Sequence, residues 1–242
     1  MTLRSLALLP LLVAQGLFVA ARATRLPEPP GPREGRIGAG PPLSLLILGD
    51  SSAAGVGAST QDKALAGQLT TALARDFTVH WRLTARSGAT TRSTLSEMAR
   101  APVFPCDVAV VALGVNDVKN GMPLAKWRQS YAALLVRLTK ENNTQHIIAC
   151  GVPPMGAFPL LPNPLRRTLG NRAAQFDRAL QEICAQTPEA HHLAFDLPMT
   201  EDLVAQDGFH PSEQLYALWA VILAQHIKAG VQARSTRTEP TE

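Results

Sequence analysis

Two stretches of the sequence hold side chains suited to nucleophilic catalysis. Ser51 lies in GDSSAAG, immediately after a run of apolar residues, and Asp207 and His210 lie three residues apart in QDGFHPS. A serine hydroxyl is a weak nucleophile at neutral pH and needs a neighbouring base, most often histidine. A carboxylate that holds Nδ1–H of such a histidine leaves Nε2 to act as the base. These residue types therefore predict acyl transfer through Ser51.

Acyl transfer also needs hydrogen-bond donors for the negative charge that develops on the carbonyl oxygen. Asn116 in GVND offers a side-chain amide, and Gly88 in ARSGATT offers a backbone N–H that a ligand can approach closely because glycine has no Cβ. The backbone N–H of Ser51 is the third candidate. Taken singly, each motif also fits a turn or a helix cap. Taken together, they favour an oxyanion hole.

Five continuous apolar runs predict strands that are buried on both faces of a sheet. They span residues 43–49, 77–85, 107–114, 145–152 and 191–197. Five patterns of helical length lie between and after them, at residues 62–75, 92–100, 123–140, 164–186 and 211–228. This alternation predicts an α/β fold in which a parallel sheet, joined by right-handed crossovers, has helices on both faces.

The candidate residues follow these apolar runs. Ser51 comes after the first run, Gly88 after the second and Asn116 after the third. His210 lies on a loop before the last helical pattern. Because ligands bind at the carboxyl ends of the strands in an open parallel sheet, we expect these residues to meet at one edge.

The first 23 residues have the features of a targeting signal. Arg4 precedes an uncharged, mainly apolar stretch over residues 6–21, and residues 21–23, Ala-Arg-Ala, match a signal-peptidase site. Arg22 at that site and Pro10 within the stretch weaken the case for cleavage. Two expectations follow. Either the protein is exported, periplasmic or secreted, without its signal peptide, or an uncleaved N-terminal segment anchors it to a membrane.

Composition divides the rest of the chain into three parts. Residues 24–42 are rich in Pro and Gly and are expected to form a linker, because these residues suit neither a helix interior nor a sheet ladder. Residues 43–230 are expected to form one catalytic domain. Residues 231–242 are polar and are expected to form a frayed tail.

Composition and charge also exclude several classes of protein. The chain has 242 residues, of which 46% are hydrophobic, enough for one globular domain with a sizeable core. The net charge of +4 comes from scattered basic residues without interleaved aromatics, so we expect no nucleic-acid partner. Cys106, Cys150 and Cys184 lie among apolar residues and are expected in the core. No Cys-x-x-Cys or His-x-x-x-His spacing predicts a metal site.

As a set, the blocks GDSSAAG, ARSGATT, GVND and DGFHPS resemble those of the SGNH hydrolases, also called GDSL esterases and lipases. The resemblance covers about residues 43–228 and includes exported lysophospholipase-like and arylesterase-like members. It implies a three-layer α/β/α, flavodoxin-like fold with a five-stranded parallel sheet. It also implies ester hydrolysis without a cofactor.

The resemblance implies a role for each candidate residue. Ser51 would be the nucleophile, His210 the base, Asp207 the residue that orients it, and Ser51, Gly88 and Asn116 the donors of the oxyanion hole. Ser52 stands where the family name has leucine. The Gly-Asp pair that precedes Ser51 indicates that Ser51, and not Ser52, is the nucleophile.

The stretch GVPPMGAFPLLPNPLRR, residues 151–167, is expected to form a wall of the substrate pocket. The apolar side chains of this stretch indicate an apolar acyl group, and packing of the loop against the body is their other interpretation: Met155, Phe158, Leu160 and Leu161. We expect a small-molecule ester with a lipid-acyl or small acyl group. The alternatives are a carbohydrate O-deacetylase, a thioesterase of the same fold, or a non-catalytic binding module. The complete set of catalytic residue types argues against the last.

Overall fold

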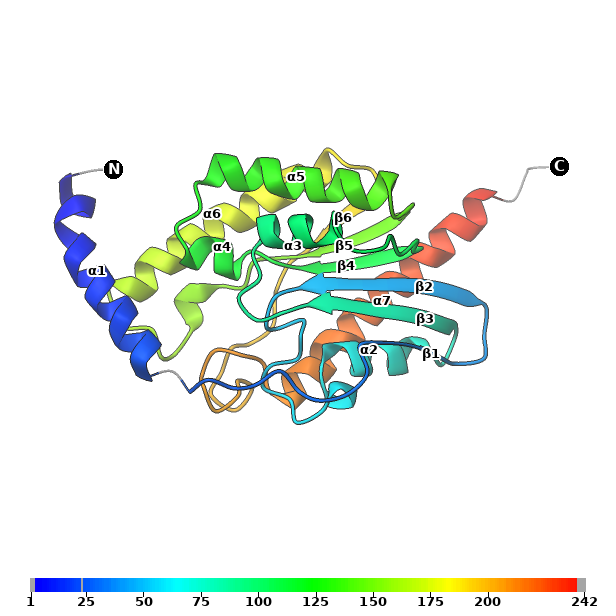
Figure 1. Ribbon diagram of the computed structural model, residues 1–242, viewed down its shortest axis with the longest axis horizontal. Helices are drawn as coiled ribbons and strands as arrows, with labels where there is room; N and C mark the ends of the chain where they lie inside the picture. The colour runs from blue at the N-terminus through cyan, green and yellow to red at the C-terminus, as the bar shows by residue number, and fades with distance from the viewer. Residues whose placement is uncertain (1–2, 23, 239–242) are drawn as a thin grey trace.

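A six-stranded sheet runs through the centre of the computed structural model, which describes residues 3–22 and 24–238 (Figure 1). In spatial order the strands are β1 (Glu34–Ile37), β3 (Thr78–Ala85), β2 (Pro42–Gly49), β4 (Val108–Ala112), β5 (His146–Cys150) and β6 (Ala190–Leu193). The last five are parallel, as the apolar runs predict, and β1 pairs antiparallel with β3. The predicted α/β sheet is confirmed, with one additional strand.

The additional strand lies within residues 24–42, so the prediction of a linker is wrong for this segment. Glu34–Ile37 contains no proline, and its backbone can therefore pair with the edge of β3, where Glu34 lies opposite Arg82. The Glu34 carboxylate also lies 2.9 Å from Nε of Arg82. Prolines precede and follow the strand, which keeps the pairing short.

Helices cover both faces of the sheet in three layers, as predicted (Figure 1). On one face lie α2 (Leu65–Leu73) and α7 (Glu213–Thr238), and on the other lie α3 (Thr91–Met98), α5 (Leu124–Lys140) and α6 (Leu165–Ala185). Successive residues of β2 alternate between the two resulting cores, because side chains of a strand point to opposite faces. Short helical turns fill the loops: η1 (Gln61–Lys63), α4 (Val115–Lys119) and η2 (Met155–Ala157).

Cys106, Cys150 and Cys184 are free thiols in the two cores, as their apolar neighbours predict. Burial raises the pKa of Cys150 to about 12 and that of Cys106 to about 11. Both thiols therefore stay protonated at neutral pH, which suits a packing role.

The last helix is longer than the sequence predicts. We expect α7 to end near residue 228 and a frayed tail to begin at residue 231, but the helix continues to Thr238. Residues 229–238 contain one glycine and no proline, so no residue interrupts the backbone hydrogen bonds of the helix. Residues 239–242 of the expected tail lie outside the described residues.

The N-terminal segment, predicted as a signal peptide or anchor, forms α1 (Leu3–Arg22), which stands beside the sheet and contacts α6 (Figure 1). Residues 1, 2 and 23, the last of which belongs to the expected cleavage site, lie outside the described residues. Within residues 3–22 and 24–238, no helix combines the length and the apolar character needed to cross a membrane.

Candidate active site

The predicted site residues meet at the carboxyl edge of the sheet. Ser51 follows β2, Gly88 follows β3 and Asn116 lies in α4, directly after β4. Asp207 and His210 lie on the loop between β6 and α7. All five residues line one cavity of about 740 Å³, a volume in the range of small-molecule sites.

His210 links Ser51 to Asp207. Its Nε2 lies 2.8 Å from Oγ of Ser51, and its Nδ1 lies 2.5 Å from Oδ2 of Asp207. Oδ1 of Asp207 accepts hydrogen bonds from the backbone N–H groups of Phe209 and His210, each at 3.0 Å. Burial alone would raise the pKa of Asp207, but the hydrogen bonds from His210 and Phe209 outweigh it and hold that pKa below its usual value. The carboxylate therefore stays charged at neutral pH and fixes the imidazole ring.

Two glycines explain why the turn after β2 is built from small residues. A Cβ on Gly49 would lie 2.4 Å from Cβ of Ala53, so the turn folds back too closely for any side chain. Gly57 has φ +103°, and a Cβ there would lie 2.3 Å from the carbonyl oxygen of Pro211. The turn thus packs directly against the residue that follows His210.

Asn116 contacts a buried carboxylate that the sequence reasoning treated only as part of a motif. Nδ2 of Asn116 donates to Oδ2 of Asp50 at 3.3 Å and to the carbonyl oxygen of Ala89 at 3.0 Å. Asp50 is 4% exposed, and its Oδ1 accepts from the N–H of Ser52 at 3.1 Å. Burial raises the pKa of Asp50 to about 6, although the Ser52 hydrogen bond and nearby His210 lower it in part.

This arrangement has a consequence for anion binding. A side-chain amide has two N–H hydrogens, and both hydrogens of Asn116 already have acceptors. An anionic oxygen that binds to Asn116 must therefore replace one of them. The bond to Asp50 is the longer of the two and is the weaker competitor.

A second buried carboxylate ties the neighbouring segments together. Oδ2 of Asp117 accepts hydrogen bonds from both the N–H and the hydroxyl of Thr91, each at 3.0 Å. The same hydroxyl accepts from Nε1 of Trp127 at 3.0 Å. Asp117 follows Asn116 in α4, and Thr91 begins the helix after the Gly88 loop. The contact between Asp117 and Thr91 therefore fixes the positions of Asn116 and Gly88, two candidate oxyanion donors, relative to each other. In the sequence, only the acidic residue at the end of GVND indicates this contact.

The walls of the cavity are mainly apolar. Met155 and Phe158 line it, as predicted. Leu160 does not line the cavity. It is 52% exposed, and its side chain lies over Gly208, where a Cβ would be 2.6 Å from Cδ1 of Leu160. Its neighbour Leu161 does line the cavity. The loop at residues 151–167 has no regular period, so the sequence could not show which of the two leucines faces inward.

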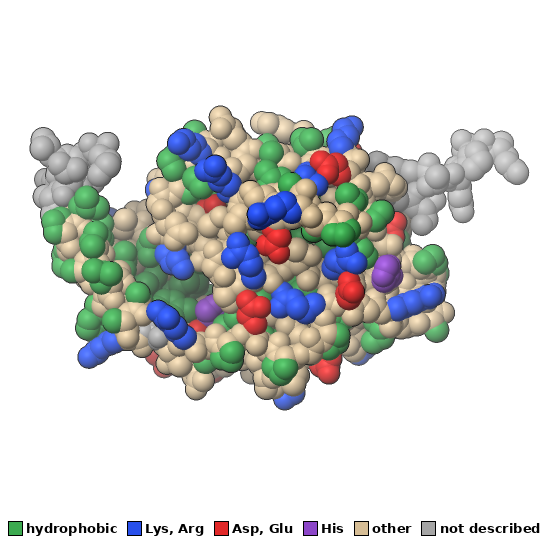
Figure 2. Space-filling model, in the orientation of Figure 1, with side chains coloured by type: hydrophobic (Ala, Val, Ile, Leu, Met, Phe, Trp, Pro, Cys, Tyr) green, Lys and Arg blue, Asp and Glu red, His purple; other side chains and the backbone are tan. Residues whose placement is uncertain are grey.

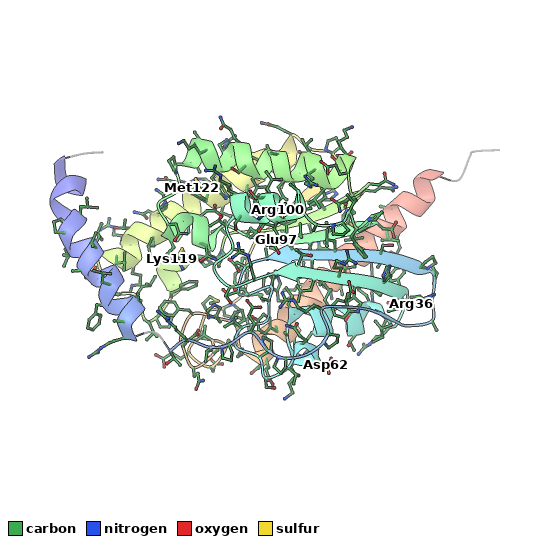
Figure 3. All side chains as sticks on the ribbon, in the orientation of Figure 1. Arg36, Asp62, Glu97, Arg100, Lys119 and Met122 are labelled. Carbon is green, nitrogen blue, oxygen red and sulfur yellow. The ribbon has the colours of Figure 1, made fainter. Side chains whose placement is uncertain are left out.

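Other segments contribute walls that the sequence reasoning missed. Apolar side chains come from α1, from α4, from the loop between β6 and α7, and from α7 itself: Leu12, Val19, Val115, Phe195, Phe209 and Trp219. Figure 2 shows the result as a hollow with apolar side chains between α1 and the body. Lys119, labelled in Figure 3 at the end of α4, also lines the cavity and adds a positive charge to it.

The three-layer α/β fold matches that of SGNH hydrolases, and its serine, histidine and aspartate lie where the resemblance in sequence leads us to expect them. The family model of the GDSL-like lipases and acylhydrolases, a family of carboxylic ester hydrolases, matches residues 47–218. The chain belongs to this family.

Relatives of known sequence or structure agree with this assignment. The GDSL-like esterase Rv1075c of Mycobacterium tuberculosis (strain ATCC 25618 / H37Rv) is 29% identical over 191 residues, which cover 75% of this chain. The aligned region spans 60% of the length of that relative.

Among solved structures, the psychrotrophic esterase EstA from Pseudoalteromonas sp. has a TM-score of 0.61 and 21% identity, covering 78% of this chain and 98% of that one. The lipase/acylhydrolase from Enterococcus faecalis has a TM-score of 0.59 and 20% identity, covering 83% and 99%. At these identities the likeness shows the fold.

Proposed function

We propose that this protein is a serine esterase that hydrolyses carboxylic esters through an acyl-enzyme on Ser51. Family membership supports the class of reaction. The observation that carries the finer proposal is the continuous path of hydrogen bonds from Oγ of Ser51 through His210 to Asp207, at 2.8 and 2.5 Å. Ser51 and His210 are 159 residues apart in the chain, so the fold itself must bring them together.

In the first step, Oγ of Ser51 attacks the carbonyl carbon while Nε2 of His210 accepts the hydroxyl proton. The electron pair of the carbonyl bond moves to its oxygen, which becomes an oxyanion. Asp207 stabilises the imidazolium that forms. The N–H groups of Ser51 and Gly88 and Nδ2 of Asn116 donate to the oxyanion, and Asn116 exchanges its hydrogen bond to Asp50 for this one.

In the second half of the first step, the oxyanion reforms the carbonyl, the ester C–O bond breaks, and His210 gives its proton to the leaving alcohol. Water then attacks the acyl-enzyme while His210 accepts a proton from it. Collapse of the second tetrahedral intermediate releases the acid and restores the hydroxyl of Ser51. The cycle is balanced without a cofactor or a metal ion.

Apolar walls support an ester with an apolar acyl group. Met155 and Phe158 line the same cavity as Ser51, and both are buried. The partner of the site is then a small-molecule ester, whose acyl group is a lipid chain or a short one. A thioesterase or a carbohydrate O-deacetylase would use the same catalytic residues. Activities measured on different substrates would distinguish these enzymes from one another.

Export, or anchoring outside the cytoplasm, is part of the proposal and rests on the N-terminal sequence. Arg4 followed by the apolar stretch over residues 6–21 supports it. Mass spectrometry of the protein recovered from each fraction of the producing cells tests it. Recovery of the intact chain from the cytoplasm alone would contradict this part of the proposal.

The proposed activity is tested with p-nitrophenyl esters from acetate to palmitate. Ser51→Ala is expected to lower kcat/KM by about 10⁶-fold, the effect of removing the nucleophile of a serine hydrolase. Ser52→Ala is the matched control, since it removes the adjacent hydroxyl, and it should stay within a few-fold of the wild type. A reactive phosphonate ester should label the peptide that contains Ser51, and His210→Ala should slow that labelling.

Equal activity of the wild type and Ser51→Ala would contradict the acyl-enzyme mechanism. Loss of activity in Ser52→Ala alone would reassign the nucleophile to the second serine. A wild type that hydrolyses no ester and takes up no phosphonate would favour the non-catalytic binding module.

A further inference from the structure

The helix α1 provides one wall of the cavity that contains Ser51 and His210. Leu12, Gly16 and Val19 line this cavity, together with Val13 and Ala20. Their spacing of three to four residues places them on one face of the helix. The wall opposite to the catalytic edge is therefore built from a segment that the sequence assigns to targeting.

A specific polar contact holds α1 in this position. Nε2 of Gln15 donates to the carbonyl oxygen of Asn163 at 2.7 Å, and its Oε1 accepts from the N–H of Leu165 at 3.0 Å. Leu165 begins α6, and the N–H groups of a first helical turn have no acceptor within their own helix. Gln15 is the one side chain in residues 6–21 with hydrogen-bonding groups, and both groups bind to the catalytic domain.

The two faces of α1 have different surroundings. A Cβ built on Gly16 meets no atom of the described residues within 4 Å, although Gly16 lines the cavity, so a side chain there would enter open space. The next residue, Leu17, is 67% exposed, and it is absent from the residues that line the cavity. These neighbours therefore provide a test position and its control.

We propose that α1 is retained in the active protein and forms the wall of an acyl subsite, so that the preferred substrates are amphiphilic esters with a long apolar acyl chain. The proposal rests on the esterase function proposed above and names its substrate class. It also selects the uncleaved form of the N-terminal segment. A polar contact as specific as that of Gln15 would have no use in a segment that is removed, and without α1 the cavity would lose one of its apolar walls.

The test compares the full chain with a chain that starts at Thr24, on p-nitrophenyl esters of increasing acyl length. For the full chain, kcat/KM should rise about fourfold with each methylene that α1 covers, the value of burying one CH₂ group. For the shorter chain, the rise should stop at a shorter acyl group. The ratio of activities on palmitate and acetate is the readout, since it does not depend on the fraction of folded enzyme.

Gly16→Phe tests the same wall without removing the helix. Its ring is expected to occupy the subsite and to lower the palmitate-to-acetate ratio about tenfold, equivalent to lost contact with about two methylenes. Leu17→Phe adds a ring of the same kind on the exposed side and should leave the ratio unchanged. Gly16→Phe favours the helix, because phenylalanine is a better helix former than glycine, and Leu17→Phe exchanges two residues whose helix propensities differ by less than about 0.7 kcal/mol.

A binding measurement separates failure of this proposal from failure of the esterase function. Dansyl undecanoate should bind to Ser51→Ala in the full chain, and Gly16→Phe added to that variant should weaken the binding. Identical acyl-length profiles for the two chain lengths, with equal ratios for Gly16→Phe and Leu17→Phe, would overturn the proposal. A mature protein that starts at Thr24 in its producing cells would overturn it as well. If no ester is hydrolysed but the probe binds as expected, the subsite stands and the esterase function fails.

Discussion

Asp50→Asn is expected to stabilise the protein at neutral pH and to slow its reaction. Asp50 lies at the floor of the site, 4% exposed, and burial raises the pKa of its carboxyl from 3.8 to about 6. The folded protein therefore binds a proton more tightly than the unfolded chain does. Stability from the neutral form is fully present below about pH 3.8 and is lost as the pH rises to about 6.

The size of the effect follows from the shift in pKa. A change from 3.8 to about 6 corresponds to about 3 kcal/mol of unfolding free energy that the charged carboxylate costs above pH 6. Asparagine has nearly the same shape and no charge. For a chain of this size, 1 kcal/mol changes Tm by about 2–4 °C, so Asp50→Asn should raise Tm by about 6–12 °C at pH 8. At pH 4 the difference should nearly vanish.

The activity of the variant should change in the opposite direction. The carboxylate of Asp50 accepts from Nδ2 of Asn116, and its loss leaves the amide held by the carbonyl oxygen of Ala89 alone. We expect kcat to fall, by less than the ~10²-fold that removal of an oxyanion donor costs, with little change in KM.

Thermal unfolding of the wild type and Asp50→Asn at pH 4 and pH 8 measures the stability, and p-nitrophenyl ester hydrolysis measures the activity. Asp62→Asn is the matched control, because Asp62 is exposed at the surface (Figure 3) and its substitution should change neither Tm nor kcat. An unchanged or lower Tm of Asp50→Asn at pH 8 would refute the reasoning. A Tm difference of the same size at both pH values would show that charge is not its cause.

Three further substitutions test the rest of the site. Asp207→Asn should lower kcat by about 10⁴-fold, because the imidazole loses the carboxylate that orients it, and steady-state kinetics with an unchanged Tm would identify this cause. Asn116→Ala should lower kcat by about 10²- to 10³-fold with KM nearly constant, and an equal rise in KM would indicate a role in ground-state binding instead. Gly49→Ala should lower the free energy of unfolding by about 1–3 kcal/mol, measured by urea denaturation, since its Cβ would lie 2.4 Å from that of Ala53.

The parallel part of the sheet could be predicted because its strands are buried on both faces. β4 is an uninterrupted run of apolar residues, and a short continuous run of this kind is typical of a strand with helices on both sides. β1 could not be predicted in the same way. Glu34–Ile37 is short and mostly exposed, and it becomes a strand because the edge of β3 is available to it, which is a property of the folded sheet.

The catalytic edge could be predicted for the same geometric reason. Ser51, Gly88 and Asn116 follow three parallel strands, and parallel strands end at a common edge. The walls of the cavity come mainly from loops and from α1. These segments are not paired with the sheet, so no strand register shows which of their side chains face the cavity. Of the two leucines expected in the pocket wall, Leu161 therefore lines the cavity and Leu160 does not, and Leu12 and Val19 of α1 enter it from a segment that its composition assigns to targeting.

The two buried carboxylates connect these observations. Asp50 and Asp117 are both destabilised as anions by burial, which raises the pKa of each. Each one accepts hydrogen bonds from groups that hold a candidate oxyanion donor: Asp50 from Asn116 itself, and Asp117 from Thr91 beside the Gly88 loop. An apolar residue at either position would avoid burial of a charge but would take away an acceptor from the backbone N–H of Ser52 or of Thr91 and remove one of the contacts that hold the donors. The acidic residues of GDSSAAG and GVND thus lower the stability of the fold while they fix the geometry of the site. The opposite effects expected for Asp50→Asn on Tm and kcat follow from this stability–activity trade-off.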